Sequence, residues 1–304
     1  MKLSEYIRDH HAPTFWYGRL KYGTIEDYVD SVKYFFKIVG DLPLEEITAT
    51  NGSRFVLGLN GFGLANETVR KHCRNLNSVF SKMGPKGPRN REAFGFLTEP
   101  PWIKPPEGFL KLPREVFDVQ VDKLFESCQE TWSCYVYPGY LGLALRPRWW
   151  ETLILFIVTT ALRRGAVLNL TWDDVDLDRA CVVIPSRIDK CRRERIKPLH
   201  PTVLEGFRAI QGGDHRLLPW QHGAKRFYKI WHEMNEQAGL EPHLKVHDLK
   251  RYALQKACRS GVDAATLQML GDHSSLQTTL DYYVRENFAQ YVSEMELPGL
   301  RRAG

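Results

Sequence analysis

The longest apolar stretch of the chain runs from Trp149 to Leu162, and it limits the fold more than any other feature. Glu151 and several threonines interrupt it, and it is shorter than the roughly 20 residues that a helix needs to cross a bilayer. A helix with so many apolar side chains has to lie in the core of a domain. We therefore predict that this segment is the central helix of a folded domain, and that the protein has no membrane-spanning segment.

The composition is that of a protein that folds around a core, with 43% hydrophobic and 12% aromatic residues among 304. This length is enough for two domains. The six cysteines form no Cys-x-x-Cys pair, which favours reduced thiols over a disulfide framework or a structural zinc site. The residues after Met1 lack the apolar stretch of a signal or transit peptide, so we expect a cytoplasmic protein. The net charge of +6 is a modest excess that favours a polyanionic partner.

Helical periodicity dominates the first part of the chain. Apolar residues between Ile25 and Val39 recur at steps of three and four, with Thr24 as the expected N-cap and Gly40 as the stop. A second helix is expected over 48–59 and a third over 66–83. The third helix has an apolar side made of Val69, Cys73, Leu76, Val79, Phe80 and Met83.

Basic residues occupy the other side of the third helix and continue beyond its end. The stretch 85–111 is too rich in Pro and Gly to be helical, and we interpret it as a basic linker between a domain of residues 1–84 and one of residues 112–304. A solvated helix face and a flexible linker explain such charges without DNA, but a phosphate backbone would also attract them. The candidate DNA-binding residues of this region are Arg70, Lys71, Arg74, Lys82, Lys86 and Arg89.

The second domain is expected to open with a helix that has Pro113 in its first turn and apolar residues from Val116 to Phe125 at helical spacing. After the central helix the periodicity changes, and apolar residues flank a short turn at Asp178 and Arg179, which predicts a small β-sheet. Helical patterns return from His247 onward. The expected fold class is therefore mainly α with a small β-sheet.

Residues of the second domain have the chemistry needed to break a DNA phosphodiester with a tyrosine. A phosphodiester is an anion that repels nucleophiles, so an enzyme that attacks it without a metal has to place fixed positive charge around the non-bridging oxygens. Arg163 directly follows the apolar helix, at a junction between helices that can hold its guanidinium rigidly. A core helix that ends in an arginine is also commonplace, so the other residues have to support this role.

The segment from Arg187 to Lys197 is strongly basic and lies where a turn would join two strands. Such a turn suits insertion beside a phosphate backbone, although a solvated hairpin tip is the simpler explanation. Lys190 is the residue of interest here, because an ammonium near the scissile bond can protonate the departing 5′ oxygen. Further candidate DNA-binding residues in this turn are Arg187, Arg192, Arg193 and Arg195.

The last part of the chain supplies histidines and a tyrosine. His247 begins a helix, and Lys250 and Arg251 follow on roughly the same helical face. Histidine gives and takes protons near neutral pH, and a cation beside it can hold a phosphate. Tyr282 follows His273, and a phenol with a pKa of about 10 needs cations and a general base before it attacks at pH 7.

In this order and spacing, these residues resemble the tyrosine recombinase (phage integrase) family over nearly the whole chain. The likeness is carried by the segments Ala161-Leu162-Arg163-Arg164-Gly165, Lys190 to Pro198-Leu199, His247 to Arg251, and Leu270-Gly271 with His273 to Tyr282. It implies an N-terminal helical SAM-like core-binding domain followed by an α+β catalytic domain. It also makes Arg163 the first catalytic arginine, Lys190 the hairpin lysine and Tyr282 the nucleophile, with His247 and His273 as the two catalytic histidines.

Several positions depart from the family pattern. Ala166 stands where the family usually has an acid, and Asp272 is an insertion in the Leu-Gly-His box. Lys250 stands where the family has its second arginine, and lysine cannot offer the bidentate fork of arginine to a phosphate. Arg251 is the alternative for that role, and Tyr283 is the alternative nucleophile.

The resemblance implies that Tyr282 attacks a DNA phosphate, forms a 3′-phosphotyrosyl link and releases a 5′ hydroxyl, and that the hydroxyl of a partner strand reverses the attack. No metal ion, ATP or other cofactor is needed. The implied partners are double-stranded DNA attachment sites, on which the chain is nucleoid-associated and forms a homotetramer, with a monomer or weak oligomer in the absence of DNA. Residues 286–295 are the candidate for a C-terminal helix exchanged between neighbours, unless they pack on their own domain.

Two other functions remain open at this point. The first is a DNA-binding protein with the recombinase fold and weak or lost strand exchange, which Ala166 and Lys250 suggest. The second is a relaxing enzyme similar to type IB topoisomerases, which shares the chemistry, although the integrase-like N-terminal domain argues against it.

Overall fold

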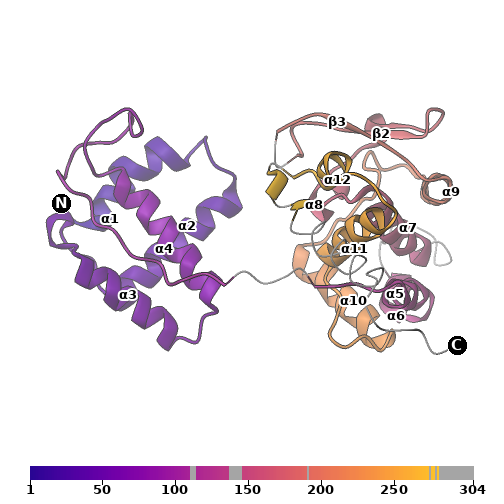
Figure 1. The fold of residues 1–304 in the computed structure, drawn as a ribbon, viewed down its shortest axis with the longest axis horizontal. Helices are drawn as coiled ribbons and strands as arrows, with labels where there is room; N and C mark the ends of the chain where they lie inside the picture. The colour runs from indigo at the N-terminus through magenta and orange to yellow at the C-terminus, as the bar shows by residue number, and fades with distance from the viewer. Residues whose placement is uncertain (110–113, 137–145, 190–191, 274, 278, 281–304) are drawn as a thin grey trace, which may run out of the picture. The chain divides into compact units, whose positions relative to one another are not determined.

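The structure of the chain, a computed structural model, describes residues 1–109, 114–136, 146–189, 192–273, 275–277 and 279–280. Two compact units divide the chain, Met1–Lys111 and Leu112–Gly304 (Figure 1). Each unit has a hydrophobic core of its own. No helix among the described residues has the length and the apolar character needed to cross a membrane.

The first unit is helical. Its elements are α1 (Leu3–Tyr6), the π-helix η1 (Ile7–Trp16), α2 (Tyr22–Ile38), the 3-10 turn η2 (Leu44–Glu46), α3 (Ala49–Gly61) and α4 (Asn66–Ser81). Helices α2, α3 and α4 pack against one another, and the apolar side predicted for α4 is fully buried between them. The three expected helices are thus confirmed. Thr24, however, is not an N-cap, because the backbone amides of Thr24 and Ile25 already donate to the Lys21 carbonyl in the first turn of α2.

The segment that we expected to be a basic linker lies against the first unit as far as the structure describes it. Ile103 is buried in the core of this unit. The Asn77 side chain donates to the Ile103 carbonyl and accepts from the Ile103 amide, each at 2.8 Å. Gly84 and Gly87 also lie in backbone hydrogen bonds, to Gly95 and Asn90. Breakers in the sequence therefore prevent a helix here without preventing an ordered, packed chain.

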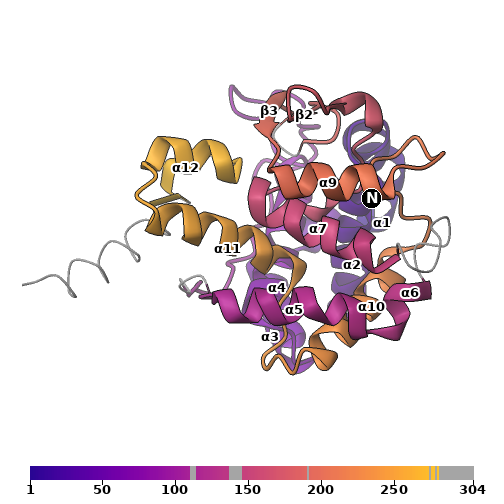
Figure 2. The ribbon, with the colours of Figure 1, turned by 90° about the vertical axis from the view of Figure 1, so that its right-hand side faces the viewer.

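The second unit is built around one helix, as predicted. Its helices are α5 (Asp118–Glu130), α6 (Trp132–Val136), α7 (Arg146–Thr160), α8 (Arg164–Val167), the 3-10 turn η4 (Trp172–Asp174), α9 (Pro201–Ile210), α10 (Ala224–Gln237), α11 (Val246–Arg259) and α12 (Ala264–Gly271). Helix α7 contacts α5, α6, α9 and α11 (Figure 2). Trp149, Trp150, Leu153 and Phe156 of α7 have no exposed surface. This confirms the apolar stretch as the central core helix.

The first helix of this unit starts later than expected. Arg114 to Phe117 are not helical, and α5 begins only at Asp118. The physical reason is that α11 and the loop before it engage the preceding chain. The Arg114 guanidinium donates to the carbonyls of Pro242 and His243, and the buried Val116 amide donates to the Gln255 side chain.

The predicted small sheet is present as three antiparallel strands in the order β1 (Val175–Asp176), β2 (Cys181–Ile184) and β3 (Arg195–Pro198). Ile184 pairs with Arg195, and Val182 pairs with Lys197. Strand β3 has an unusual alternation. The side chain of Ile196 is outward and 69% exposed, whereas Lys197 is 5% exposed. A buried lysine next to an exposed isoleucine indicates that polar groups inside the unit bind the ammonium.

Candidate functional site

Arg163 lies between two helices, as its position in the sequence indicated. Helix α7 ends at Thr160, Ala161 follows with a positive φ of 52°, and Arg163 is the N-cap residue of α8. Its side chain is half-buried. Among the residues that the structure describes, the Arg163 guanidinium has no hydrogen bond or ion pair. Within the described part of the chain, its five donors are therefore available to an anion.

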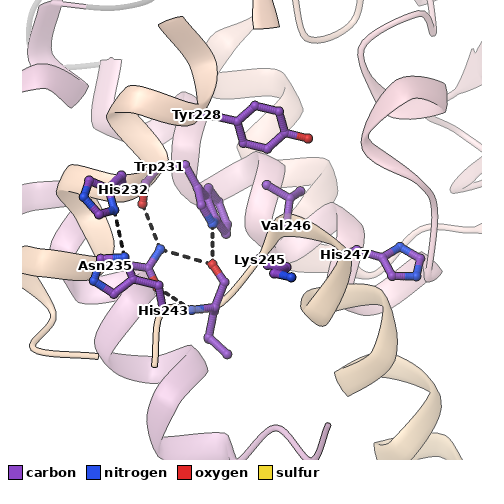
Figure 3. Close-up of a pocket in the computed structure, with 9 residues that line it drawn as sticks. Tyr228, Trp231, His232, Asn235, His243, Lys245, Val246 and His247 are labelled. Atoms are coloured by element: carbon purple, nitrogen blue, oxygen red, sulfur yellow. Dashed lines mark hydrogen bonds between the residues drawn. The ribbon is translucent and has the colours of Figure 1, made fainter. Parts of the chain in front are cut away.

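His247 lies in the first turn of α11, and the residues before it are firmly held. The Leu244 carbonyl accepts a hydrogen bond of 2.7 Å from the Trp231 indole, and the Leu244 amide donates to the fully buried Asn235 side chain, also at 2.7 Å (Figure 3). Asp248 completes the helix start, because its carboxylate accepts from the Lys245 amide at 2.8 Å. These contacts fix where α11 begins, and with it the place of His247. Asn235 and Trp231 were not singled out from the sequence.

A pocket of about 430 Å³ adjoins His247. Figure 3 shows Tyr228, Trp231 and the pair His232 and His243 around it. The Nδ1 atoms of His232 and His243 are 2.8 Å apart, so one ring donates to the other. Within the described part of the chain, no group of three or more His, Cys, Asp and Glu side chains is placed to hold a metal ion.

His273 follows the end of α12 directly and packs over Gly271. A Cβ on Gly271 would lie 2.9 Å from the imidazole ring of His273, so only glycine permits this contact. The His273 Nδ1 atom is 3.0 Å from the hydroxyl of the buried Thr279. This hydrogen bond orients the ring.

Lys250 of α11 donates to the carbonyls of Ala161 and Gly271, so the segments that carry Arg163, His247 and His273 meet. Burial, followed by the charges of Lys250 and Arg163, lowers the pKa of His273 to about 4. Burial and the charges of Arg251, Lys250 and Arg163 lower the pKa of His247. The structure therefore brings Arg163, His247 and His273 together from the end of α7, the start of α11 and the end of α12. Both imidazoles are held towards their neutral form, next to a guanidinium.

The two cations that follow His247 differ in environment. Lys250 is 2% exposed, and its ammonium donates to the carbonyls of Ala161 and Gly271, both at 2.6 Å. Burial lowers the pKa of Lys250 to about 7 against the attraction of Asp272. Arg251 is more accessible, with 31% of its side chain exposed, and it donates to Asp248 at 2.9 Å.

Two residues next to Lys250 were not recognised from the sequence as part of this region. Lys197 of β3 donates to the carbonyls of Thr160 (2.9 Å) and Leu270 (2.6 Å). Asp272, which appeared in the sequence as an insertion, is buried and 3.2 Å from the Lys197 ammonium. The only sequence signal for Lys197 was its place in a strand, where a charged residue precedes Pro198.

The candidate DNA-binding residues fall into two groups. One group is exposed: Arg74, Lys86, Arg89, Arg192 and Arg193. The others have partners within the chain, since Arg70 donates to Pro106, Lys71 to Asp27 and Lys82 to Asn90, and the Arg187 side chain, although exposed, donates to Asp174. Arg195 contacts Asp272 and lies 3.6 Å from Asp189, so it faces the interior. Lys190, Tyr282, Tyr283 and residues 286–295 lie outside the described residues.

The phage integrase family model matches residues 144–290. This range contains Arg163, His247 and His273. This part of the chain is therefore similar to tyrosine recombinases. The tyrosine recombinase XerA of Thermococcus kodakarensis is 25% identical over 272 residues, which span 85% of this chain and 83% of XerA.

Solved structures of two integrases share the fold of this chain over most of its length. A lambda integrase tetramer bound to a Holliday junction has a TM-score of 0.68 at 14% identity, over 99% of this chain and 80% of that one. The Tn1549 transposon integrase in complex with transposon right end DNA has a TM-score of 0.64 at 15% identity, over 96% of this chain and 97% of that one. The mainly helical fold class with a small sheet is thereby confirmed.

Proposed function

We propose that this chain is a tyrosine recombinase that cuts and rejoins duplex DNA at specific sites through a covalent link to Tyr282. One observation carries the proposal: three segments of the second unit, joined by the hydrogen bonds of Lys250, bring together the Arg163 guanidinium and two imidazoles with lowered pKa values, His247 and His273. This set matches the needs of a phosphodiester, whose negative charge has to be neutralised while protons move.

In the proposed reaction, the Tyr282 oxygen attacks phosphorus and the bond from phosphorus to the 5′ oxygen breaks. The phenol proton passes to a neutral imidazole, and the departing 5′ oxygen takes a proton from Lys190. A 3′-phosphotyrosyl link results, and the 5′ hydroxyl of a partner strand reverses the step. Because one phosphoester replaces another, the reaction needs no ATP.

We propose Arg163 and Arg251 as the cations that hold the non-bridging oxygens. Arg251 is favoured over Lys250 because a third of its side chain is exposed, and because its charge is the foremost of the charges that lower the pKa of His247. The Lys250 ammonium is buried and bound to two carbonyls. We further propose the exposed residues Arg74, Lys86, Arg89, Arg192 and Arg193 as contacts to the DNA backbone.

The proposed substrate is a pair of duplex DNA sites, and the proposed assembly is a homotetramer on them, at the nucleoid. The names of the relatives support this, since XerA is a tyrosine recombinase and the lambda integrase structure is a tetramer on a Holliday junction. The family comparisons do not favour a DNA-binding protein without strand exchange.

The test uses a duplex site that the protein selects from a random DNA library, nicked so that cleavage traps the enzyme. We expect an adduct that survives SDS, is lost in Tyr282→Phe and persists in Tyr283→Phe. An adduct that is lost only in Tyr283→Phe would move the nucleophile by one residue. Tight and salt-sensitive binding with no adduct would instead indicate a protein that binds DNA without cutting it.

A further inference from the structure

The ends of α7 and α12 face the same interior region, and a proposed catalytic residue lies within three residues of each end. The residue that follows each helix is in the left-handed region, Ala161 after α7 and Asp272 after α12, each with a φ of 52°. Arg163 comes two residues after the first, and His273 directly after the second. The last carbonyls of a helix have no partner within it and carry partial negative charge, so both ends attract cations.

Two buried lysines join these helix ends. Lys250 donates to Ala161 and Gly271, both at 2.6 Å. Lys197 donates to Thr160 at 2.9 Å and to Leu270 at 2.6 Å. Each ammonium therefore binds one carbonyl at the end of α7 and one carbonyl at the end of α12. The two lysines come from elements far apart in the sequence, α11 and β3, so the arrangement is set by the fold.

Asp272 supplies the counter-charge. Its carboxylate is 3.2 Å from the Lys197 ammonium, 3.9 Å from the Lys250 ammonium and in contact with the Arg195 guanidinium. Arg195 in turn lies 3.6 Å from Asp189, a buried residue that directly precedes Lys190 in the chain. Charges buried this deeply are costly unless each has a partner. The carboxylate of Asp272 is such a partner for both lysines.

We propose that Lys197, Lys250 and Asp272 form an ionic brace. The brace fixes the distance between the residues that follow α7, which include Arg163, and the residues that follow α12, which include His273. This proposal rests on the proposed function, and it makes Lys250 a positioning residue and not a phosphate ligand. An ammonium has three donors. In Lys250 two of them are on carbonyls, and the Asp272 carboxylate forms an ion pair with the ammonium at 3.9 Å. Lys250 and Asp272, two departures from the family pattern, then belong to the same brace.

The brace predicts how substitutions act on cleavage of the trapped site at saturating DNA. Methionine matches the length of the lysine stem, so Lys250→Met and Lys197→Met keep the volume and remove the donors. We expect each to slow cleavage by about 10-fold to 100-fold through misplacement of Arg163 and His273, with the Kd for DNA within about 3-fold of the parent value. Lys250→Arg, which restores the family residue, should be slowed as well, because a planar guanidinium does not fit the lysine site.

A substrate with a neutral methylphosphonate at the scissile position separates positioning from direct contact. A cation that neutralises the phosphate is no longer required there, so the rate loss of Arg163→Ala shrinks on this substrate. The loss of Lys250→Met should stay the same as on the phosphodiester. Lys256→Met is the matched control, since Lys256 lies on the exposed side of α11 and binds Asp118. It should cleave both substrates as the parent does.

Two outcomes would overturn the brace: a loss in Lys250→Met that disappears on the methylphosphonate, or a Lys197→Met protein that cleaves at the parent rate. Thermal melting of each variant shows whether it folds. A readout without DNA keeps the proposal separate from the proposed function. Below pH 7, NMR of the lysine ammonium groups should show two slowly exchanging signals, and Lys197→Met and Lys250→Met should each remove one. If the parent protein shows no slowly exchanging signals, the brace is refuted even if cleavage occurs. If the signals are present but the protein forms no adduct, only the proposed function is refuted.

Discussion

The two units bury their polar groups in different ways. Among the described residues of the first unit, the buried polar side chains are His11, Ser31, His72 and Asn77, and none of them needs to carry a charge. In the second unit, full charges are buried as well, among them Asp189, Lys197, Lys250 and Asp272. Neutral hydrogen bonds stabilise a scaffold at little cost, whereas buried charges are expensive. The costly buried charges lie in the second unit, where the proposed site requires exact placement of its side chains.

The largest effect is expected from Asp272→Asn. Asparagine keeps the shape and tolerates the left-handed backbone of this position, but it leaves Lys197, Lys250 and Arg195 without the carboxylate. We expect a loss of about 3 to 5 kcal/mol in the free energy of unfolding of the second unit, measured by denaturant unfolding. Asp263→Asn is the control at the other end of α12, where an exposed side chain caps the helix. Equal losses in the two variants would contradict the contrast between buried and exposed charge.

A smaller effect is expected from Asn77→Ala in the first unit. The substitution leaves the amide and the carbonyl of the buried Ile103 without partners, which should cost about 2 to 3 kcal/mol. Hydrogen exchange of the α4 amides, compared with those of α7, reports the first unit separately. Asn75→Ala serves for comparison, since the Asn75 side chain binds Ser31 and the Asp27 carbonyl at a less buried place. If the two substitutions cost the same, buried neutral hydrogen bonds do not hold this scaffold.

The smallest effect, about 1 kcal/mol for each pH unit, is a difference in pH dependence. The pKa of Lys250 is about 7 in the folded chain and 10.5 in the unfolded chain. Between these values the unfolded chain binds more protons, so the second unit should gain stability as pH rises from 7 towards 10. For His11 the folded pKa is about 4 and the unfolded value 6.5, so the first unit should lose stability as pH falls from 6.5 to 4.

Urea unfolding between pH 4 and pH 10 checks these two windows. Lys250→Met should abolish the gain above pH 7 in the second unit and leave the acid response of the first unit unchanged. If the first unit also gains stability above pH 7, the gain in that pH range does not come from Lys250.

Much of the fold was readable because it depends on local periodicity. The apolar side of α4 and the apolar run in α7 are both buried as the spacing indicated. Helix α9 lies outside the predicted helices, although His200 and Pro201 mark its start. The start of α5 was misplaced because contacts from Gln255 and Pro242, far along the chain, hold the preceding residues.

The candidate site was readable only in part, for a related reason. Arg163, His247 and His273 lie in local motifs, and the fold brings them together. Alternation along β3 would place Ile196 inside and Lys197 outside, but the structure reverses this because carbonyls of α7 and α12 bind the ammonium. No local pattern contains those carbonyls. The burial of Lys250 also depends on distant carbonyls, those of Ala161 and Gly271. Its sequence position alone therefore suggested a phosphate ligand.

The pairing of Lys250 with Asp272 bears on how such a chain evolves. If only one of the two positions changes, with lysine replacing arginine at 250 or aspartate replacing a neutral residue at 272, the resulting protein has an unmatched charge in its interior. The two positions should therefore change together among descendants of this lineage, and with them the buried lysine of β3. A search pattern that insists on arginine at the 250 position would overlook the members that have made this exchange.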